Sequence, residues 1–158
     1  MESKLIQYAI FFAKDAHKGQ VRKYTGEPYF NHCEAVAKLV EEKGGSEAQI
    51  AAAYLHDTVE DTDRTLNDIF TEFGDEVGFL VNDLTDVFTH EAFPNLNRAK
   101  RKELEAKRLG RMPEESKLVK WCDLADNTSS IVSHDPGFAK IYLVEKARCL
   151  DEMGFIRL

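Results

Sequence analysis

An unbroken apolar run that ends in a histidine and an aspartate constrains this chain more than any other feature. Residues 50–55 read Ile-Ala-Ala-Ala-Tyr-Leu, a composition that favours helix, and His56-Asp57 follow directly. A helix that is apolar on all sides is buried. Because an unpaired charge is costly in such surroundings, we expect His56 and Asp57 to have specific partners at the end of a buried helix.

A second pair, His134-Asp135, shows that this dipeptide alone carries little information. It stands directly before Pro136. Aspartate is a favoured N-cap and proline is favoured at the first helical position, so this copy predicts a helix that begins after a loop. The two copies therefore differ in their surroundings.

Acidic residues follow the first pair within about one helical turn. If the helix continued, His56 and Glu60 would be i, i+4 neighbours, and so would Asp57 and Asp61. Like charges placed this close destabilise a helix unless a cation lies among them. The alternative is a solvated acidic helix end beside a hydrogen-bonded core histidine, and these residues alone do not decide between the two.

Two further segments offer partners to this pair. Asn31 is a good N-cap, which would place His32 in the first turn of the next helix, where the helix dipole favours a neutral imidazole. Between residues 117 and 132, a polar stripe with apolar flanks predicts a mostly buried helix whose polar groups need partners. Asp123 lies in that stripe with Lys120, Asn127 and Ser130.

These segments together predict a metal site. The candidate ligands are two imidazoles and two carboxylates, His32, His56, Asp57 and Asp123. The absence of thiolates disfavours a structural zinc cage and suits one divalent ion, either manganese, ferrous iron, cobalt or zinc in an open site. Such a site leaves room for water and a phosphate oxygen, as metal-assisted hydrolysis requires. Glu60 and Asp61 would orient or deprotonate that water.

The chain resembles the HD-domain metal-dependent phosphohydrolases, and more narrowly the hydrolase domain of the RelA/SpoT-type alarmone enzymes and their small single-domain relatives. The resemblance extends from about residue 5 to residue 133, and its motifs are in the family's order. The matching stretches are Ala16-His17-Lys18-Gly19-Gln20-Val21-Arg22-Lys23, Gly26-Glu27-Pro28-Tyr29 with His32, Leu55-His56-Asp57-Thr58-Val59-Glu60-Asp61-Thr62, and residues 120–127.

This resemblance implies an all-α, HD-type helical bundle that uses manganese to hydrolyse the 3′-pyrophosphate of guanosine tetra- or pentaphosphate. It matches the four candidate ligands to the metal site, and Glu60 and Asp61 to the pair that activates water. It also implies a set of substrate contacts that would offset the negative charge of the phosphates and hold the nucleotide. These contacts are Arg22 and Lys23 in a basic loop, Lys120, Asn127 facing the ribose, and Lys100 and Arg101 on a basic helix.

Two departures from the family pattern concern the surroundings of the substrate. Tyr24 follows the basic pair where the family more commonly has a small hydroxyl residue and glycine. After Asp123 the family usually has a basic residue and then an aromatic residue or histidine before the asparagine, whereas this chain reads Leu124-Ala125-Asp126-Asn127. These departures leave open a hydrolase of another nucleotide, such as an adenosine alarmone or a phosphorylated nicotinamide cofactor. A nucleotide sensor without catalysis is a more distant alternative, and the intact Glu60-Asp61 pair argues against it.

Composition predicts one compact domain over residues 1–158. The chain is 43% hydrophobic, enough for a core of its own. A net charge of −7 and a pI near 5.3 argue against nucleic-acid or anionic-membrane partners and favour a small anionic nucleotide held by local basic groups.

The sequence carries no pattern of a secretory signal or membrane span, and its three cysteines form no motif, so we expect a cytoplasmic protein with reduced thiols. The oligomeric state stays open.

Periodicity predicts about eight helices. The first is an amphipathic helix over residues 5–16, and the others are expected at 32–43, 46–57, 65–72, 75–87, 96–110, 114–132 and 137–152. Thr65 and Asp68 resemble a capping box. The least regular stretch, residues 88–97, would either cover substrate or be anchored to the core by Phe88 and Phe93.

Overall fold

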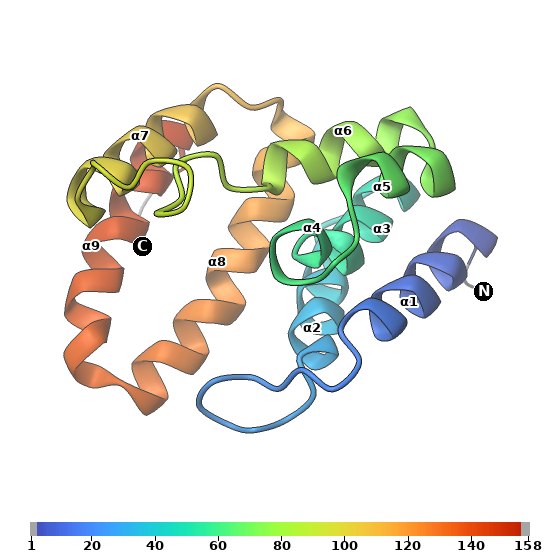
Figure 1. Ribbon diagram of the computed structural model, residues 1–158, viewed down its shortest axis with the longest axis horizontal. Coiled ribbons are helices and arrows are strands. Elements are labelled where there is room, and N and C mark those ends of the chain that lie inside the picture. The colour runs from blue at the N-terminus through green and yellow to red at the C-terminus, as the bar shows by residue number, and fades with distance from the viewer. Residues whose placement is uncertain (1–2, 156–158) are drawn as a thin grey trace.

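The computed structural model describes residues 3–155 and is all α within them, with nine helices and no strand. The predicted all-α fold is therefore confirmed. The additional helix is α4, a short segment within residues 58–64, where the sequence periodicity predicts no helix. The helices are α1 (Lys4–Ala16), α2 (Phe30–Glu42), α3 (Glu47–Leu55), α4 (Thr58–Asp61), α5 (Leu66–Phe73), α6 (Asp75–Leu84), α7 (Arg98–Gly110), α8 (Glu114–His134) and α9 (Pro136–Met153) (Figure 1).

Helix α3 is the centre of the larger part of the molecule. Every residue from Ala48 to Leu55 is buried, as the apolar run predicts, and α3 packs against α1, α2, α6 and α8. Its alanines let these neighbours approach closely. Helix α8 extends beyond this core, and α7 and α9 pack beside it around a smaller cluster that includes Leu109, Leu124 and Leu150 (Figure 1). The larger core around α3 and the smaller cluster beside α7 and α9 thus share α8, the longest of the described helices.

Side chains cap the N-termini of five of the helices, α1, α3, α5, α7 and α9. Thr65 and Asp68 form the predicted capping box, and Asp135 caps α9 at the backbone N–H of Phe138. The prediction that Asn31 is the N-cap of α2 is wrong. The helix begins at Phe30, two residues before the predicted start at His32, with Tyr29 at the N-cap position. Asn31 thus lies within the first turn, and its side chain donates to Glu27 Oε2 at 3.0 Å.

The chain does not continue as one helix from Leu55 to Asp61. Helix α3 ends at Leu55, the Thr58 hydroxyl donates to the Leu55 carbonyl at 2.7 Å, and α4 begins at Thr58. His56 and Asp57, predicted as the last residues of a helix over 46–57, therefore occupy a turn between two helices, and the condition for i, i+4 pairing along one continuous helix is not met. The backbone N–H of Asp61 still donates to the Asp57 carbonyl. This break lets adjacent residues direct their side chains toward one point.

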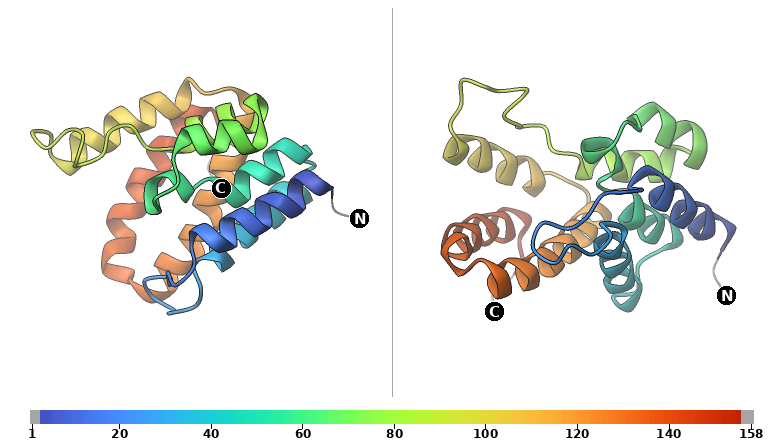
Figure 2. Two further views of the ribbon diagram at one scale, coloured as in Figure 1. Left: turned by 45° about the vertical axis from the view of Figure 1, so that its right-hand side comes forward. Right: turned by 60° about the horizontal axis from the view of Figure 1, so that its bottom comes forward.

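The segment between α6 and α7 leaves the helical body and returns (Figure 2). The rings of Phe88 and Phe93 pack together at 5.0 Å, and Glu105 of α7 accepts the backbone N–H groups of Val87 and Phe88. These contacts anchor the start of the segment to α7. No helix among residues 3–155 is long and apolar enough to cross a bilayer.

Gly110 lies where α7 approaches the end of α9 most closely. A Cβ atom added there would lie 2.6 Å from the backbone oxygen of Glu152, which cannot move aside as a side chain can. We expect Gly110→Ala to lower the free energy of unfolding by about 1–3 kcal/mol, measured by urea denaturation. Gly137→Ala is the matched control, because its nearest atom is 3.8 Å away, and it should be neutral or slightly stabilising. Equal effects of both substitutions would contradict this packing.

Candidate functional site

Three separate elements bring the four candidate ligands together. His32 lies in the first turn of α2, His56 and Asp57 in the turn after α3, and Asp123 on α8. One ligand atom from each residue lies within 4.8 Å of the corresponding atom of every other. Both histidines and Asp123 are buried, while Asp57 faces a cleft. The four residues predicted from separate parts of the sequence thus form one cluster.

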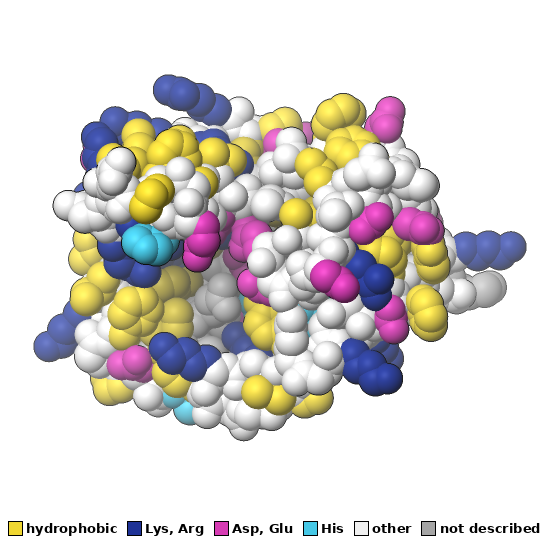
Figure 3. Space-filling view, viewed as in Figure 1, with side chains coloured by type: hydrophobic (Ala, Val, Ile, Leu, Met, Phe, Trp, Pro, Cys, Tyr) yellow, Lys and Arg dark blue, Asp and Glu magenta, His cyan; other side chains and the backbone are white. Residues whose placement is uncertain are grey.

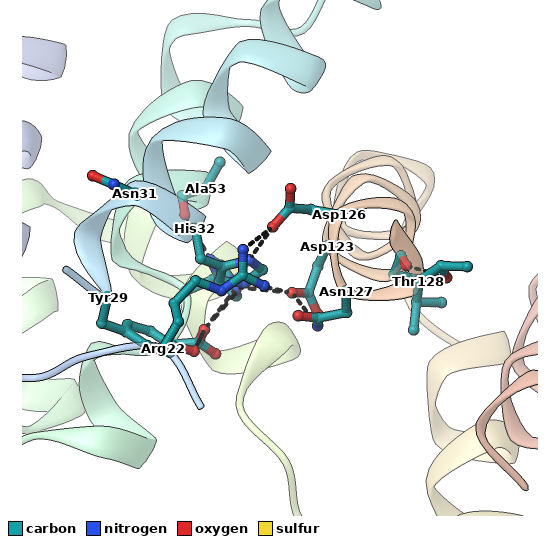
Figure 4. A network of polar contacts seen from close by, with 12 residues as sticks. Arg22, Tyr29, Asn31, His32, Ala53, Asp123, Asp126, Asn127 and Thr128 are labelled. Atoms are coloured by element: carbon teal, nitrogen blue, oxygen red, sulfur yellow. Dashed lines mark hydrogen bonds and ion pairs between the residues drawn. The ribbon is translucent and has the colours of Figure 1, made fainter. Parts of the chain in front are cut away.

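Hydrogen bonds on the far side of each ring determine where the ring protons lie. His56 Nδ1 donates to the Ala53 carbonyl at 2.6 Å, and a carbonyl can only accept. His32 Nδ1 donates to Asp126 Oδ2, also at 2.6 Å (Figure 4). A neutral ring therefore keeps its proton on Nδ1, and Nε2 presents a lone pair to the cluster. This is the arrangement by which second-shell groups prepare histidine for a metal.

The two Nε2 atoms face carboxylate oxygens. Asp123 Oδ1 lies 3.0 Å from His32 Nε2 and 3.1 Å from His56 Nε2, and Asp57 Oδ2 lies 3.0 Å from His56 Nε2. Lone pairs facing anionic oxygens repel each other unless a proton or a cation lies between them. The set of two imidazole nitrogens and two carboxylate oxygens fits one divalent ion.

The ionisation of the cluster follows from the same contacts. Burial alone would lower the pKa of His56, but the charges of Asp57 and Asp123 outweigh it and raise the pKa well above its usual value. Burial would raise the pKa of Asp57, yet His56 lowers it to about 2. Without a metal, protons therefore take the place of the cation between rings and carboxylates.

Further side chains hold the carboxylates in position. Lys120 donates to Asp123 Oδ2 at 3.1 Å. Asn127 donates to Asp123 Oδ1 at 3.2 Å (Figure 4). Lys120, Asp123 and Asn127 of the predicted polar stripe are thus in contact on α8. The Tyr29 hydroxyl donates to Asp57 Oδ2 at 2.5 Å. Sequence reasoning missed this role of Tyr29, although the residue was part of the matching motif.

Glu60 and Asp61 line the cavity beside the cluster. This cavity has a volume of about 270 Å³, and Asp57, Asp123 and Lys120 also line it. Burial, followed by the charge of Asp86, raises the pKa of Glu60 to about 8, and burial with Asp57 raises that of Asp61 to about 6. Glu60 also accepts the backbone N–H of Asp86. Both carboxylates are thus solvent-accessible inside a recess, where a bound cation would favour their ionised forms.

The cavity opens into a longer cleft over α8. One adjoining cavity, of about 260 Å³, shares Lys102, Lys120 and Tyr142 with it, and another, of about 230 Å³, shares Tyr29 and Asn127. Figure 3 shows this face hollowed, with acidic and basic side chains around the hollow. The combined space suits a ligand longer than one phosphate group.

The predicted substrate contacts lie at different distances from this cleft. Lys120 and Asn127 line the central cavity, and Arg22 and Lys23 line one end. Lys100 and Arg101 do not line these cavities.

The two basic residues of α7 have other partners. Lys100 pairs with Glu103, and Arg101 donates to the Leu96 carbonyl. Their neighbour Lys102 faces the cleft instead. The basic helix lies where the sequence predicts it, and Lys102 is the residue of this basic run that lines the cleft. Substrate contact by Lys100 and Arg101 stays a prediction.

A model of the HD domain matches residues 9–130. The chain belongs to the HD domain family. Among its curated relatives is the guanosine-3′,5′-bis(diphosphate) 3′-pyrophosphohydrolase MESH1 of Xenopus tropicalis, 38% identical over 77% of this chain and 66% of that protein. The human MESH1 is 37% identical over the same shares. A probable pyrophosphohydrolase of the same name from Synechocystis is 51% identical, but over only 51% of this chain and 10% of that protein.

Two solved structures are similar to this chain. A structure described as a metazoan ortholog of SpoT that hydrolyzes ppGpp matches with a TM-score of 0.84 and 27% identity, and the match covers 97% of this chain and 87% of that one. A second, from Listeria monocytogenes, has a TM-score of 0.68 and 29% identity. The HD domain and the histidine–aspartate cluster together indicate a divalent metal site.

The raised pKa of His56 predicts how the metal-free protein responds to pH. The folded state binds this proton more tightly than the unfolded chain, whose histidine pKa is about 6.5. The resulting stability is complete below that pH and is lost as the pH rises through the folded-state value. In chelator, the urea midpoint should therefore fall above about pH 6.5, and excess divalent metal should remove the fall. A chelated protein whose midpoint rises with pH would contradict the cluster.

Proposed function

We propose that this protein is a metal-dependent phosphohydrolase that removes the 3′-pyrophosphate of guanosine tetra- or pentaphosphate. The supporting observation is a four-ligand cluster at the floor of a cleft in a chain whose relatives carry that activity in their names. We place this activity in one domain over residues 1–158 in the cytoplasm, where thiols such as Cys33 and Cys122 stay reduced.

His32, His56, Asp57 and Asp123 would hold the metal. A bound divalent cation there would polarise a phosphate oxygen and lower the pKa of a bound water. We propose manganese, the metal that the family resemblance implies, and the nitrogen and oxygen donors without thiolate suit it. Ferrous iron, cobalt and zinc suit the same donors, so a comparison of metals added to the chelated protein would rank them.

The protein's own carboxylates and cations would perform the remaining chemistry. Glu60 and Asp61 face the cavity beside the ligands, where one of them would take a proton from water as its oxygen attacks the 3′-phosphorus. The bond between phosphorus and the ribose 3′-oxygen breaks, and that oxygen takes a proton. The products are the nucleoside 5′-diphosphate or triphosphate and pyrophosphate. Lys120 and Lys102 line the same cavity and would offset the phosphate charge, and Asn127 would face the ribose.

The two His-Asp pairs of this chain provide a matched test. Asp57→Asn replaces an anionic ligand by a neutral amide, so release of pyrophosphate from guanosine tetraphosphate should fall by at least about 10²-fold. Asp135→Asn changes the other pair: asparagine is also a good N-cap, and its amide can still form a hydrogen bond with the Tyr24 hydroxyl, so turnover should stay near wild type. Equal turnover by wild type and Asp57→Asn would contradict the assignment of the metal centre.

Glu60→Gln separates water activation from metal binding. Because Glu60 lies outside the ligand cluster, the variant should keep its metal content, measured by elemental analysis. Its kcat should fall about 10²- to 10⁴-fold, the usual contribution of a general base. Wild-type kcat in this variant would assign the role to Asp61 alone, which Asp61→Asn would test in the same assay.

One observation supports testing a different nucleotide as the substrate. Arg22, expected to pack on the base or phosphates, instead donates to Asp126 at 3.1 Å. A hydrolase of an adenosine alarmone or a phosphorylated nicotinamide cofactor therefore belongs in the same substrate panel. Tight binding of a nucleotide without any product would support the sensor alternative.

A further inference from the structure

One carboxylate oxygen links the metal cluster to the basic loop. Asp126 Oδ2 accepts from His32 Nδ1 at 2.6 Å and from an Arg22 guanidinium nitrogen at 3.1 Å (Figure 4). His32 is a candidate metal ligand, and Arg22 belongs to the loop between α1 and α2. The same carboxylate oxygen therefore serves a candidate metal ligand and a basic residue of the loop.

The arrangement depends on a residue in which this chain departs from its family pattern. An acid, Asp126, stands where that pattern has an aromatic residue or histidine. Its charge attracts Arg22, whose side chain is only 13% exposed and also lies 3.9 Å from Glu27. Tyr24, the other departure, donates to Asp135 at 2.9 Å. These two contacts fasten the loop to α8 and to the start of α9.

Sharing an acceptor weakens each of its two bonds. A guanidinium draws electron density from Oδ2, so His32 meets a poorer acceptor than a carboxylate facing the imidazole alone. An acceptor on the far side of a ligating histidine orients the ring and increases its basicity. Displacing Arg22 from Asp126 would therefore make His32 a better ligand. A phosphate oxygen is the natural competitor for Arg22, because it offers the same charge-assisted hydrogen bonds.

We propose that Asp126 is a positioning residue that couples an anion bound at Arg22 to the metal affinity of His32. This coupling rests on the metal centre of the proposed function. A phosphate group that engages Arg22 tightens metal binding, and the metal tightens the binding of that phosphate by the same factor, because coupling free energies are reciprocal. The loop and the metal then act together when a phosphorylated substrate enters.

A double-mutant cycle on Mn²⁺ affinity, measured by isothermal titration calorimetry, tests the coupling without using turnover. Asp126→Asn should raise the Kd for Mn²⁺ about 10- to 100-fold. Arg22→Gln, which imitates displacement of the guanidinium, should lower the Kd about 5-fold or more. In the Asp126→Asn background, Arg22→Gln should have no further effect. Asp126→Glu should recover part of the lost affinity.

The control is Lys18→Gln, which removes one positive charge from an exposed position in the same loop and should leave the Kd unchanged. An equal gain from Lys18→Gln and Arg22→Gln would reduce the effect to general electrostatics and overturn the coupling. Unchanged or weaker Mn²⁺ binding in Arg22→Gln would also overturn it, as would wild-type affinity in Asp126→Asn. Absence of Mn²⁺ binding in the wild type would instead overturn the metal centre, so the two failures are distinguishable.

Discussion

The convergence of two imidazole lone pairs on carboxylate oxygens is the constraint around which this molecule is arranged. Each ring is turned inward because its other nitrogen donates outward, to the Ala53 carbonyl for His56 and to Asp126 for His32. The resulting cluster repels itself unless positive charge enters. A fold that buries such a cluster gains stability by binding a cation, and its stability and chemistry therefore depend on the same ion.

The backbone around the cluster explains how so few residues achieve this convergence. Helix α3 is buried on all sides, so its C-terminal end is held in a fixed position, and the break after Leu55 turns His56 and Asp57 out of the helical path. Helix α8 then brings Asp123 past that end. Because α8 also carries the smaller core beneath α7 and α9, the metal cluster and the cleft walls share one rigid element.

The sequence predicted the features that depend on local chemistry. The apolar run, the capping box at Thr65 and the polar stripe around Asp123 each reflect the residues themselves, and the structure contains all three. The sequence predicted less well the side-chain contacts that depend on residues far away in the chain. Asp126 was visible only as a departure from a pattern, because its partners Arg22 and His32 lie 104 and 94 positions away. Lys102, rather than Lys100 or Arg101, faces the cleft because tertiary packing sets which side of α7 turns inward.

The stretch just after α6 is held from both sides of the cleft. Glu60 of α4 accepts the backbone N–H of Asp86, and Glu105 of α7 accepts those of Val87 and Phe88. Three consecutive peptide groups thus form a short mechanical link between the carboxylate beside the metal cluster and the far wall. An outward swing of α7 that keeps these hydrogen bonds would therefore pull on Glu60 through the three linked peptide groups.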